Sequence, residues 1–322
     1  MWLIIALLNR RKRRCCYNGR SMSLVVVGSV AYDGIQTPYG KVDRILGGAA
    51  TYFSLAASFF IPVKVVAVVG DDFDPADAEL LGKHNIDLEG LERAPGKTFF
   101  WSGVYSDDLN DRTTLTTDLN VFADFNPKLP ESYRACPYLF LGNIQPSLQT
   151  RVRRQMTQTR LVGGDTMNYW IRETPADLAA AIREWDVLVI NDSEARMLSG
   201  EYQLRKAAAK ILTMGPSNLI IKRGEYGAVL FREDGYFTTP GFLLDAVFDP
   251  TGAGDSFAGG FMGFLAGSGA DPSSGEVLRQ AVIYGSVLGS FCCEEFGVRR
   301  LAKLTWKEID ARYRDFRAFT QF

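Results

Sequence analysis

The 322-residue sequence is poor in histidine, a side chain on which many hydrolases and zinc enzymes depend. Its single histidine, His84, lies in the polar stretch LGKHNIDLEG, which has the composition of a connection. With one histidine in such a place, the sequence indicates neither a Ser-His-Asp triad nor a zinc site built from histidines.

The five cysteines lack the spacing of a metal site or of a disulfide framework. Two pairs are immediate neighbours, Cys15–Cys16 and Cys292–Cys293, while Cys136 stands alone, and no CxxC pair occurs. This usage favours a reducing, cytoplasmic setting.

The chain also lacks an excess of either charge, with 36 basic and 37 acidic side chains. A broad nucleic-acid surface or an anionic-membrane surface requires clustered positive charge. The composition therefore argues against both kinds of partner. No apolar stretch reaches the roughly 20 residues that a bilayer-spanning helix needs.

Residues 1–21 differ from the rest of the chain, because a short apolar run there precedes a basic cluster, the reverse of a secretory signal. We interpret this segment as a mis-translated upstream stretch, with a weak membrane-surface tether as the alternative. Met22 directly precedes a clean strand pattern. We therefore predict a non-structural extension over 1–21 and a single domain over 22–322.

From residue 22 onward, buried-strand patterns alternate with helix patterns. The segments SLVVVGSVAYD and VKVVAVVGDDF predict strands, and GGAATYFSLAASFF and PADAELLGKHNI predict helices. Such alternation indicates a parallel sheet with helices on both faces. Residues 96–125 break the pattern, since KTFFWSGVYS and RTTLTTDLNVFADF predict a hairpin with one face available to cover a site.

A glycine-rich turn leads into an apolar helix pattern in DPTGAGDSFAGGFMGFLAG, residues 249–267. Gly252, Ala253 and Gly254 would lie at or just before the helix N-terminus, where unpaired N–H groups and the helix dipole favour an anion. Asp255 beside such a site suits a general base that orients a hydroxyl for attack on phosphate. The dipole would lower the pKa of Asp255. A simple helix cap is the alternative interpretation.

At these residues the sequence resembles the PfkB (ribokinase-like) family of small-molecule kinases. The resemblance runs from Ser23 to about Leu301. The motifs that carry it are Asp249, Gly252–Asp255 and Gly259–Gly260, the pair Gly47–Gly48, the block VVGDDF, the pattern Asn191-Asp-Ser-Glu194 and the segment LIIKRGEYGAVLF. It implies an α/β fold, a ribokinase-like three-layer α/β/α arrangement with a mostly parallel central sheet. A small β lid from segments about 33–46 and 96–125 would close over the substrate and often mediates dimers.

The resemblance also implies roles for individual residues. They are Asp255 as catalytic base; Gly252, Ala253 and Gly254 as anion hole; Asp33, Gly47, Gly48, Tyr52 and Asn168 for substrate; Lys222, Gly224 and Gly227 for nucleotide; and Asn191 and Glu194 for Mg²⁺ through water. Several have plainer alternatives. Asn191-x-x-Glu194 also fits a helix capping box, and Lys222 a solvated strand end.

We therefore expect an ATP- and Mg²⁺-dependent kinase that phosphorylates a hydroxymethyl group of a sugar. A nucleoside kinase is the alternative, because aromatic lid residues such as Trp101 and Tyr105, together with Tyr52, fit a nucleobase; they fit a lid–lid dimer core as well. A nucleotide sensor without turnover is a third, weaker hypothesis. The acceptor, the oligomeric state and a need for a monovalent cation stay open.

Overall fold

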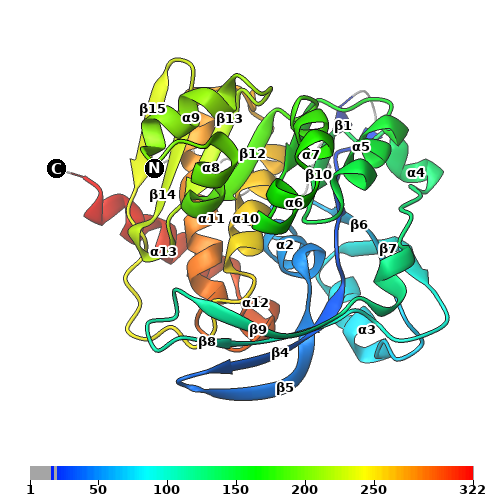
Figure 1. Ribbon diagram of the computed structural model, residues 1–322. Coiled ribbons are helices and arrows are strands. Elements are labelled where there is room, and N and C mark those ends of the chain that lie inside the picture. Colours follow the sequence, from blue (N-terminus) through cyan, green and yellow to red (C-terminus); the bar gives the residue numbers. More distant parts are fainter. Residues whose placement is uncertain (1–15, 18–19, 322) are drawn as a thin grey trace.

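A nine-stranded sheet forms the centre of the protein, for which the computed structural model describes residues 16–17 and 20–321 (Figure 1). The strand order is β15-β14-β13-β12-β11-β10-β3-β6-β7, and every pairing is parallel except those of β14 with its two neighbours. The strands are β3 (Leu24–Val27), β6 (Val63–Val69), β7 (Ile86–Arg93), β10 (Tyr138–Leu141), β11 (Leu161–Gly164), β12 (Val187–Asn191), β13 (Asn218–Lys222), β14 (Ala228–Arg232) and β15 (Gly235–Thr239).

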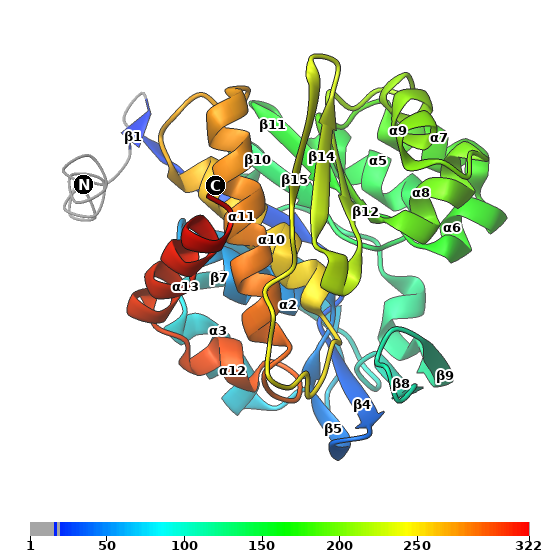
Figure 2. The ribbon, with the colours of Figure 1, turned by 90° about the vertical axis from the view of Figure 1, so that its left-hand side faces the viewer.

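Helices cover both faces of this sheet, as Figure 2 shows. One layer contains α2 (Ala49–Ala57), α3 (Pro75–Lys83), α10 (Ala253–Gly267), α11 (Gly275–Cys292), α12 (Arg299–Lys303) and α13 (Trp306–Phe319). The other contains α4 (Glu131–Arg134), α5 (Pro146–Gln155), α6 (Asn168–Glu173), α7 (Pro175–Ile182), α8 (Asp192–Ser199) and α9 (Leu204–Leu212). The predicted three-layer α/β/α fold with a mostly parallel sheet is confirmed.

The strand sequences explain why the sheet lies between two layers. β3 is a run of Leu and Val in which Leu24 and Val26 face one core and Val25 and Val27 face the other. A strand that is apolar on both faces is stable only when both faces are covered. The alternation inferred from the sequence therefore corresponds to the observed layers.

A second, four-stranded sheet lies apart from the central one, at the bottom of Figure 1. Its order is β5-β4-β8-β9, with β4 (Ala31–Thr37), β5 (Gly40–Gly47), β8 (Phe100–Tyr105) and β9 (Arg112–Asp118). β4 and β8 pair in parallel, and the two outer pairings are antiparallel. This sheet occupies the two segments expected for the lid, and we call it the lid sheet.

Close packing of helices explains the glycines of α10. A Cβ on Gly259 would lie 2.3 Å from the Phe53 carbonyl oxygen in α2, and one on Gly260 would lie 2.8 Å from the Tyr284 carbonyl oxygen in α11. Helix α10 therefore packs between two other helices with its backbone close to theirs. This contact fixes the direction in which its N-terminus points.

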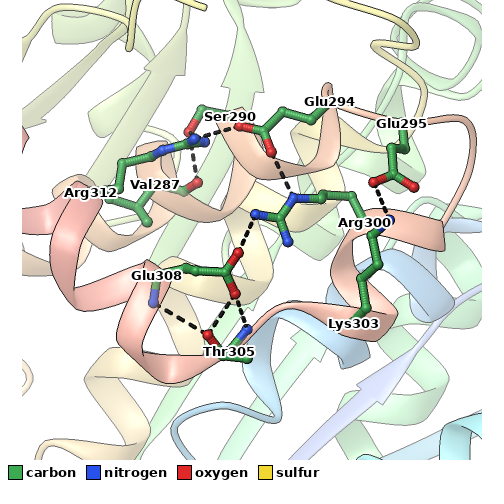
Figure 3. A network of polar contacts seen from close by, with 9 residues as sticks. All are labelled: Val287, Ser290, Glu294, Glu295, Arg300, Lys303, Thr305, Glu308 and Arg312. Carbon is green, nitrogen blue, oxygen red and sulfur yellow. Dashed lines mark hydrogen bonds and ion pairs between the residues drawn. The ribbon is translucent and has the colours of Figure 1, made fainter.

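A polar network holds the C-terminal helices to the end of α11 (Figure 3). Glu294 accepts hydrogen bonds from Arg300 and Arg312, and Arg300 also donates to Glu308. Glu308 in turn forms a capping box with Thr305 at the start of α13. The network thus fixes the segment that follows α11, which contacts the turn before α10.

The prediction for residues 1–21 falls mostly outside the described residues. Within that segment, β1 (Cys16–Tyr17) pairs antiparallel with β2 (Arg20–Ser21). The single domain over 22–322 and the extension before it stay predictions. Among the described residues, no helix has both the length and the apolar character to cross a membrane.

Candidate active site

Three neighbouring parallel strands end at one edge of the central sheet with a polar residue. Asp165 follows β11 directly, Asn191 is the last residue of β12, and Lys222 is the last residue of β13. Asn191 and Lys222 are register partners. Because carboxyl ends of adjacent parallel strands form a common ligand-binding edge, these side chains converge.

The N-terminus of α10 lies against this edge. The Nζ of Lys222 lies 2.6 Å from the position that a Cβ on Gly254 would occupy. The same ammonium group opposes the rise in pKa of Asp165, Glu194 and Asp255, so it is close to all three carboxylates. The Lys222 ammonium therefore lies against the start of α10 rather than at a solvated strand end, and its contact with a nucleotide stays a prediction.

The turn before α10 is fixed by a buried acid. Asp249 is fully buried, and its two carboxylate oxygens accept from the backbone N–H groups of Thr251 and Gly297, each at 2.8 Å. Gly252 follows in the left-handed conformation, with φ of +75°, and caps the helix. An L-residue would be strained there. The turn is thus tied to the segment behind α11 that the network of Figure 3 holds in place.

Not every backbone amide predicted for the anion hole is free. The Ala253 N–H donates to the Pro250 carbonyl at 3.2 Å. Gly254 and Asp255 occupy the first turn of α10, where an N–H has no acceptor within the helix. The turn therefore offers an anion the amides of Gly254 and Asp255, with the Ala253 amide already engaged.

The electrostatics of Asp255 differ from the expectation that the helix dipole lowers its pKa. Burial raises the pKa of Asp255, and the nearby charges of Lys222 and Arg112 only partly offset that rise. Burial also raises the pKa of Asp165, and the charge of Asp255 raises it further. Removal from water thus outweighs the charges of Lys222 and Arg112, and the raised pKa makes Asp255 a stronger base once ionised.

Asp33 forms a second part of the site, at the start of the lid sheet. It lies in β4, and its Oδ2 is 1.9 Å from where a Cβ on Gly47 would stand. Burial, together with the charges of Asp249 and Asp255, raises the pKa of Asp33 to about 7. Asp33 is therefore close to the turn that carries Asp255, and Gly47 is required because any side chain would displace the carboxylate.

Gly48, the second glycine of the pair, is required by the backbone at the start of α2. It caps α2 with φ of +92°, and a Cβ there would meet the Ser29 carbonyl oxygen at 2.5 Å. The pair therefore both makes room for Asp33 and starts a helix.

Asn191 and Glu194 form a capping box at the start of α8. The Asn191 Oδ1 accepts from the Glu194 N–H at 2.7 Å, and a Glu194 carboxylate oxygen accepts from the Asn191 N–H at 2.8 Å. The capping interpretation is thus correct. It leaves the second Glu194 oxygen available, and the buried Oδ1 of Asp165 has no hydrogen-bond partner.

These oxygens define what the site offers a cation. In the described part of the chain, no three His, Cys, Asp or Glu side chains form a cluster that would hold a metal by themselves. Mg²⁺ is usually bound by one or two carboxylates together with water and phosphate oxygens. The free oxygens of Glu194 and Asp165 fit such an ion.

Comparison with known proteins identifies the chain. Residues 21–304 match the family described as pfkB family carbohydrate kinase. The chain belongs to this family. It is 26% identical over 249 residues to a cytidine kinase of Thermococcus kodakarensis, a match that covers 75% of this chain and 87% of that protein.

Solved structures agree on the fold. The nucleoside kinase of Methanocaldococcus jannaschii matches with a TM-score of 0.74 at 19% identity, covering 92% of this chain and 100% of that one. Aminoimidazole riboside kinase from Salmonella enterica, solved with aminoimidazole riboside and an ATP analogue, matches with a TM-score of 0.70 at 18% identity, covering 90% and 99%. The expected class, a phosphotransferase acting on an alcohol group of a sugar or nucleoside, is confirmed by the family.

Two residues predicted to bind substrate have distinct surroundings in this pfkB family member. Tyr52 is 1% exposed, and its ring packs against Gly252, where a Cβ would lie 2.3 Å from the ring. The Tyr52 ring therefore packs against the turn and supports it, and stacking of Tyr52 on a ligand stays a prediction without support from this burial. Asn168 begins α6 with an exposed side chain, whereas Asp165, three residues earlier, is the one beside Asp255.

Gly224 and Gly227, predicted for nucleotide, shape the connection between β13 and β14. Gly224 has φ of +55° and begins a single 3₁₀ turn, Gly224–Tyr226. Gly227 has φ of +85°, and a Cβ there would lie 2.0 Å from the Thr239 carbonyl oxygen. The backbone conformation at both positions favours glycine whether or not a ligand is bound. Contact of either glycine with a nucleotide stays a prediction.

Sequence reasoning missed Arg112, noted Trp101 only as an aromatic lid residue, and gave Asp165 no role of its own. Asp165 was visible only as a polar residue after a strand, and its free buried oxygen appears in the tertiary structure. Trp101 is the register partner of Asp33 across the β4–β8 pair. Arg112 on β9 influences Asp33, Glu194 and Asp255 through its charge. A strand-end position was the available signal for Asp165, and none existed for Arg112.

Proposed function

We propose that this chain transfers the γ-phosphoryl group of ATP to a hydroxymethyl group of a sugar. One observation carries the proposal: Asp255 lies on the first turn of α10, where the Nζ of Lys222 approaches Gly254, and its charge raises the pKa of both Asp33 and Glu194. A carboxylate near a hydroxyl-binding acid and a phosphate-binding cation would link acceptor and donor.

In the proposed reaction, Asp33 accepts hydrogen bonds from hydroxyls of the acceptor and orients it. Asp255 accepts the proton of the hydroxymethyl group as its oxygen forms a bond to the γ-phosphorus. The bond between that phosphorus and the β–γ bridging oxygen breaks, and ADP leaves. The amides of Gly254 and Asp255 stabilise charge on the phosphoryl oxygens, and Lys222 neutralises part of it.

Mg²⁺, when bound with the nucleotide, would supply further neutralisation of phosphate charge. Glu194, oriented by the Asn191 capping box, and Asp165 would hold it through water molecules. Gly224 and Gly227 would shape the turn near the nucleotide. Whether a monovalent cation also takes part is a separate question, which assays in sodium and in potassium salts would answer.

A nucleoside acceptor is the second candidate, and Trp101 favours it. Its indole lies on the same face of the lid sheet as Asp33, because the two residues are register partners. A flat aromatic ring beside the sugar-binding acid suits stacking of a base. Phosphate transfer measured across ribose, fructose, myo-inositol and several nucleosides would separate the two candidates, and absence of ADP release with all of them would instead favour a nucleotide sensor.

Composition and cysteine chemistry indicate the cellular environment and the partners of the proposed enzyme. Cys136, Cys292 and Cys293 are free thiols, which supports a reducing, cytoplasmic environment. The balanced charge supports small molecules rather than nucleic acid or membrane as partners. A homodimer through the lid sheet is part of the proposal.

The test of the proposal is the variant Asp255→Asn. We expect kcat to fall about 10²- to 10⁴-fold, because the variant cannot accept the hydroxyl proton. Binding of ATP, measured by calorimetry, should change little. Asp177→Asn is the matched control, since Asp177 is an exposed acid in the first turn of α7, away from this site. Turnover of Asp255→Asn at the wild-type rate would exclude Asp255 as the base.

A further inference from the structure

A buried glutamine joins the carboxyl ends of two neighbouring strands. Gln149 lies in α5 and is 1% exposed. Its Nε2 lies 3.3 Å from the carbonyl oxygen of Leu141, 2.9 Å from that of Gly142 and 3.1 Å from that of Asp165. Leu141 ends β10, and Asp165 directly follows β11, its parallel neighbour. The side-chain amide therefore donates hydrogen bonds across two strand ends, and we call these three contacts the Gln149 bridge.

The surroundings permit only one orientation of the Gln149 amide. Three carbonyl oxygens lie around Nε2, and only the NH₂ group of an amide can donate to them. Oε1 is buried and has no hydrogen-bond partner among the described residues. A methionine of similar volume would fill the same space without an unpaired oxygen. What the amide adds is therefore the Gln149 bridge rather than packing.

The bridge ties the main chain of Asp165 to the centre of the sheet. The Asp165 N–H donates to the Leu141 carbonyl at 3.1 Å, and the Asp165 carbonyl accepts from Gln149. Next to Leu141, the Gly142 N–H donates to the Val27 carbonyl of β3 at 2.8 Å. Both polar groups of the Asp165 main chain are thus bonded to parts that the central strands hold in place. The direction in which its side chain leaves the backbone is fixed as a result.

The carboxylate of Asp165 depends on this main-chain anchoring. Its Oδ1 is buried and, within the part of the chain that the structure describes, forms no hydrogen bond. The backbone, and not a bond at this oxygen, therefore determines where it lies. The charges of Asp255 and Lys222 both act on Asp165, so it is near the residues of the proposed reaction. A shift of the strand end would move the carboxylate relative to them.

We propose that Gln149 is a positioning residue of the active site, which holds the Asp165 carboxylate near Asp255 by joining the ends of β10 and β11. This rests on the proposed function, in which Asp165 supports Mg²⁺ through water. Gln149 is buried, so it acts through the strand ends and not on a reactant. A misplacement of about 1 Å within an active site can cost about 10²-fold in rate. Loss of the bridge should therefore lower turnover rather than acceptor binding.

Gln155 provides a matched control on the same helix. Its Nε2 donates to the Pro127 carbonyl at 3.0 Å, and its Oε1 accepts from the Leu129 N–H at 2.9 Å. It therefore joins backbone groups as Gln149 does, but in the segment before α4 rather than at the ends of β10 and β11. Gln149→Met and Gln155→Met remove the same kind of contact, one at the site and one away from it.

The experiment measures kcat, KM and stability of both variants with any acceptor that the wild type phosphorylates. We expect Gln149→Met to lower kcat about 10- to 100-fold and Gln155→Met to change it less than about twofold. The KM for the acceptor should change little in either variant, because Asp33 lies in the lid sheet. Both variants should unfold at lower urea concentration than the wild type, since each loses hydrogen bonds. Hydrogen exchange at the Asp165 amide, measured by mass spectrometry, should become faster in Gln149→Met only.

Two further variants test the route through Asp165. Asp165→Asn should lower kcat by itself, and adding Gln149→Met should cause almost no further loss, because both changes act on the same carboxylate. In Gln149→Glu, a carboxyl that faces three carbonyl oxygens would stay protonated and keep one O–H donor. Its kcat should lie between those of the wild type and Gln149→Met, and this variant decides the question if Gln149→Met does not fold.

Three results would each overturn the role of Gln149 and leave the kinase function intact. The first is wild-type kcat in Gln149→Met, or in Gln149→Glu where Gln149→Met does not fold. The second is an equal loss of kcat in Gln149→Met and Gln155→Met. The third is losses that multiply when Gln149→Met is combined with Asp165→Asn. A wild-type protein that releases no ADP with any acceptor would instead overturn the proposed function and this inference together.

Discussion

Asp33 is the residue at which pH should act most directly. Burial and the charges of Asp249 and Asp255 raise its pKa to about 7. Only the ionised carboxylate accepts two sets of hydrogen bonds from acceptor hydroxyls. We therefore expect the KM for the acceptor to rise as pH falls through about 7. Asp33→Asn should have a raised KM that varies little with pH, and steady-state kinetics across this range would check both; a wild-type KM independent of pH would contradict the assignment.

The same carboxyl predicts how stability depends on pH. Its pKa is higher in the folded chain than the ordinary value of 3.8, so between about pH 4 and about pH 7 the folded state binds more protons than the unfolded state. The contribution of Asp33 to stability therefore falls as pH rises through this window. The ionised form costs on the order of 4 kcal/mol at most. In urea unfolding, Asp33→Asn should gain stability relative to wild type above about pH 7 and show no such gain near pH 4.

Among elements, the C-terminal helices depend on one shared acid. Glu294 accepts from both Arg300 and Arg312, and these three side chains are between 13% and 24% exposed (Figure 3). Glu294→Gln removes the acid that the two largely buried arginines share, so Arg312 loses this ion pair and Arg300 keeps only the pair with Glu308. It should reduce the free energy of unfolding by about 2–4 kcal/mol. Urea denaturation monitored by fluorescence would measure it.

An exposed ion pair of the same region is the control for that measurement. Lys303 pairs with Glu295 but is 62% exposed. Lys303→Met should reduce the free energy of unfolding by less than about 1 kcal/mol. Equal losses in the two variants would show that burial is not what gives Glu294 its importance.

The elements also separate what sequence patterns can predict from what they cannot. The strand and helix patterns over 23–83 and 249–267 matched β3, β6, α2, α3 and α10, since each depends on local periodicity and on burial of both sheet faces. The lid hairpin was predicted from its alternation and turn. The partners of that hairpin were not, because the pairing of β4 with β8 joins segments about 70 residues apart, and nothing local encodes its register.

For the whole molecule, the proposed dimer depends on the lid sheet. Its edge strand β9 is largely exposed, and Leu115 at its bulge is 62% exposed. An exposed edge strand with an apolar side chain favours pairing with another chain. We expect a dimer in light scattering that Leu115→Asp converts to monomer. Tyr202→Asp, at an exposed aromatic outside the lid, should leave the mass unchanged, and a monomeric wild type would contradict the proposal.

The amino-acid sequence by itself determined the layered α/β fold, the helix that begins after Gly252, and the acid Asp255 at its start, because strand burial, helix periodicity and turn chemistry are local properties. The tertiary structure decided which other side chains join that acid. It buried the Tyr52 ring against the turn at Gly252, and it brought Asp165, Lys222 and Arg112 near enough to Asp255 for their charges to interact. These outcomes depend on strand order, register and burial, which arise only when distant segments pack together.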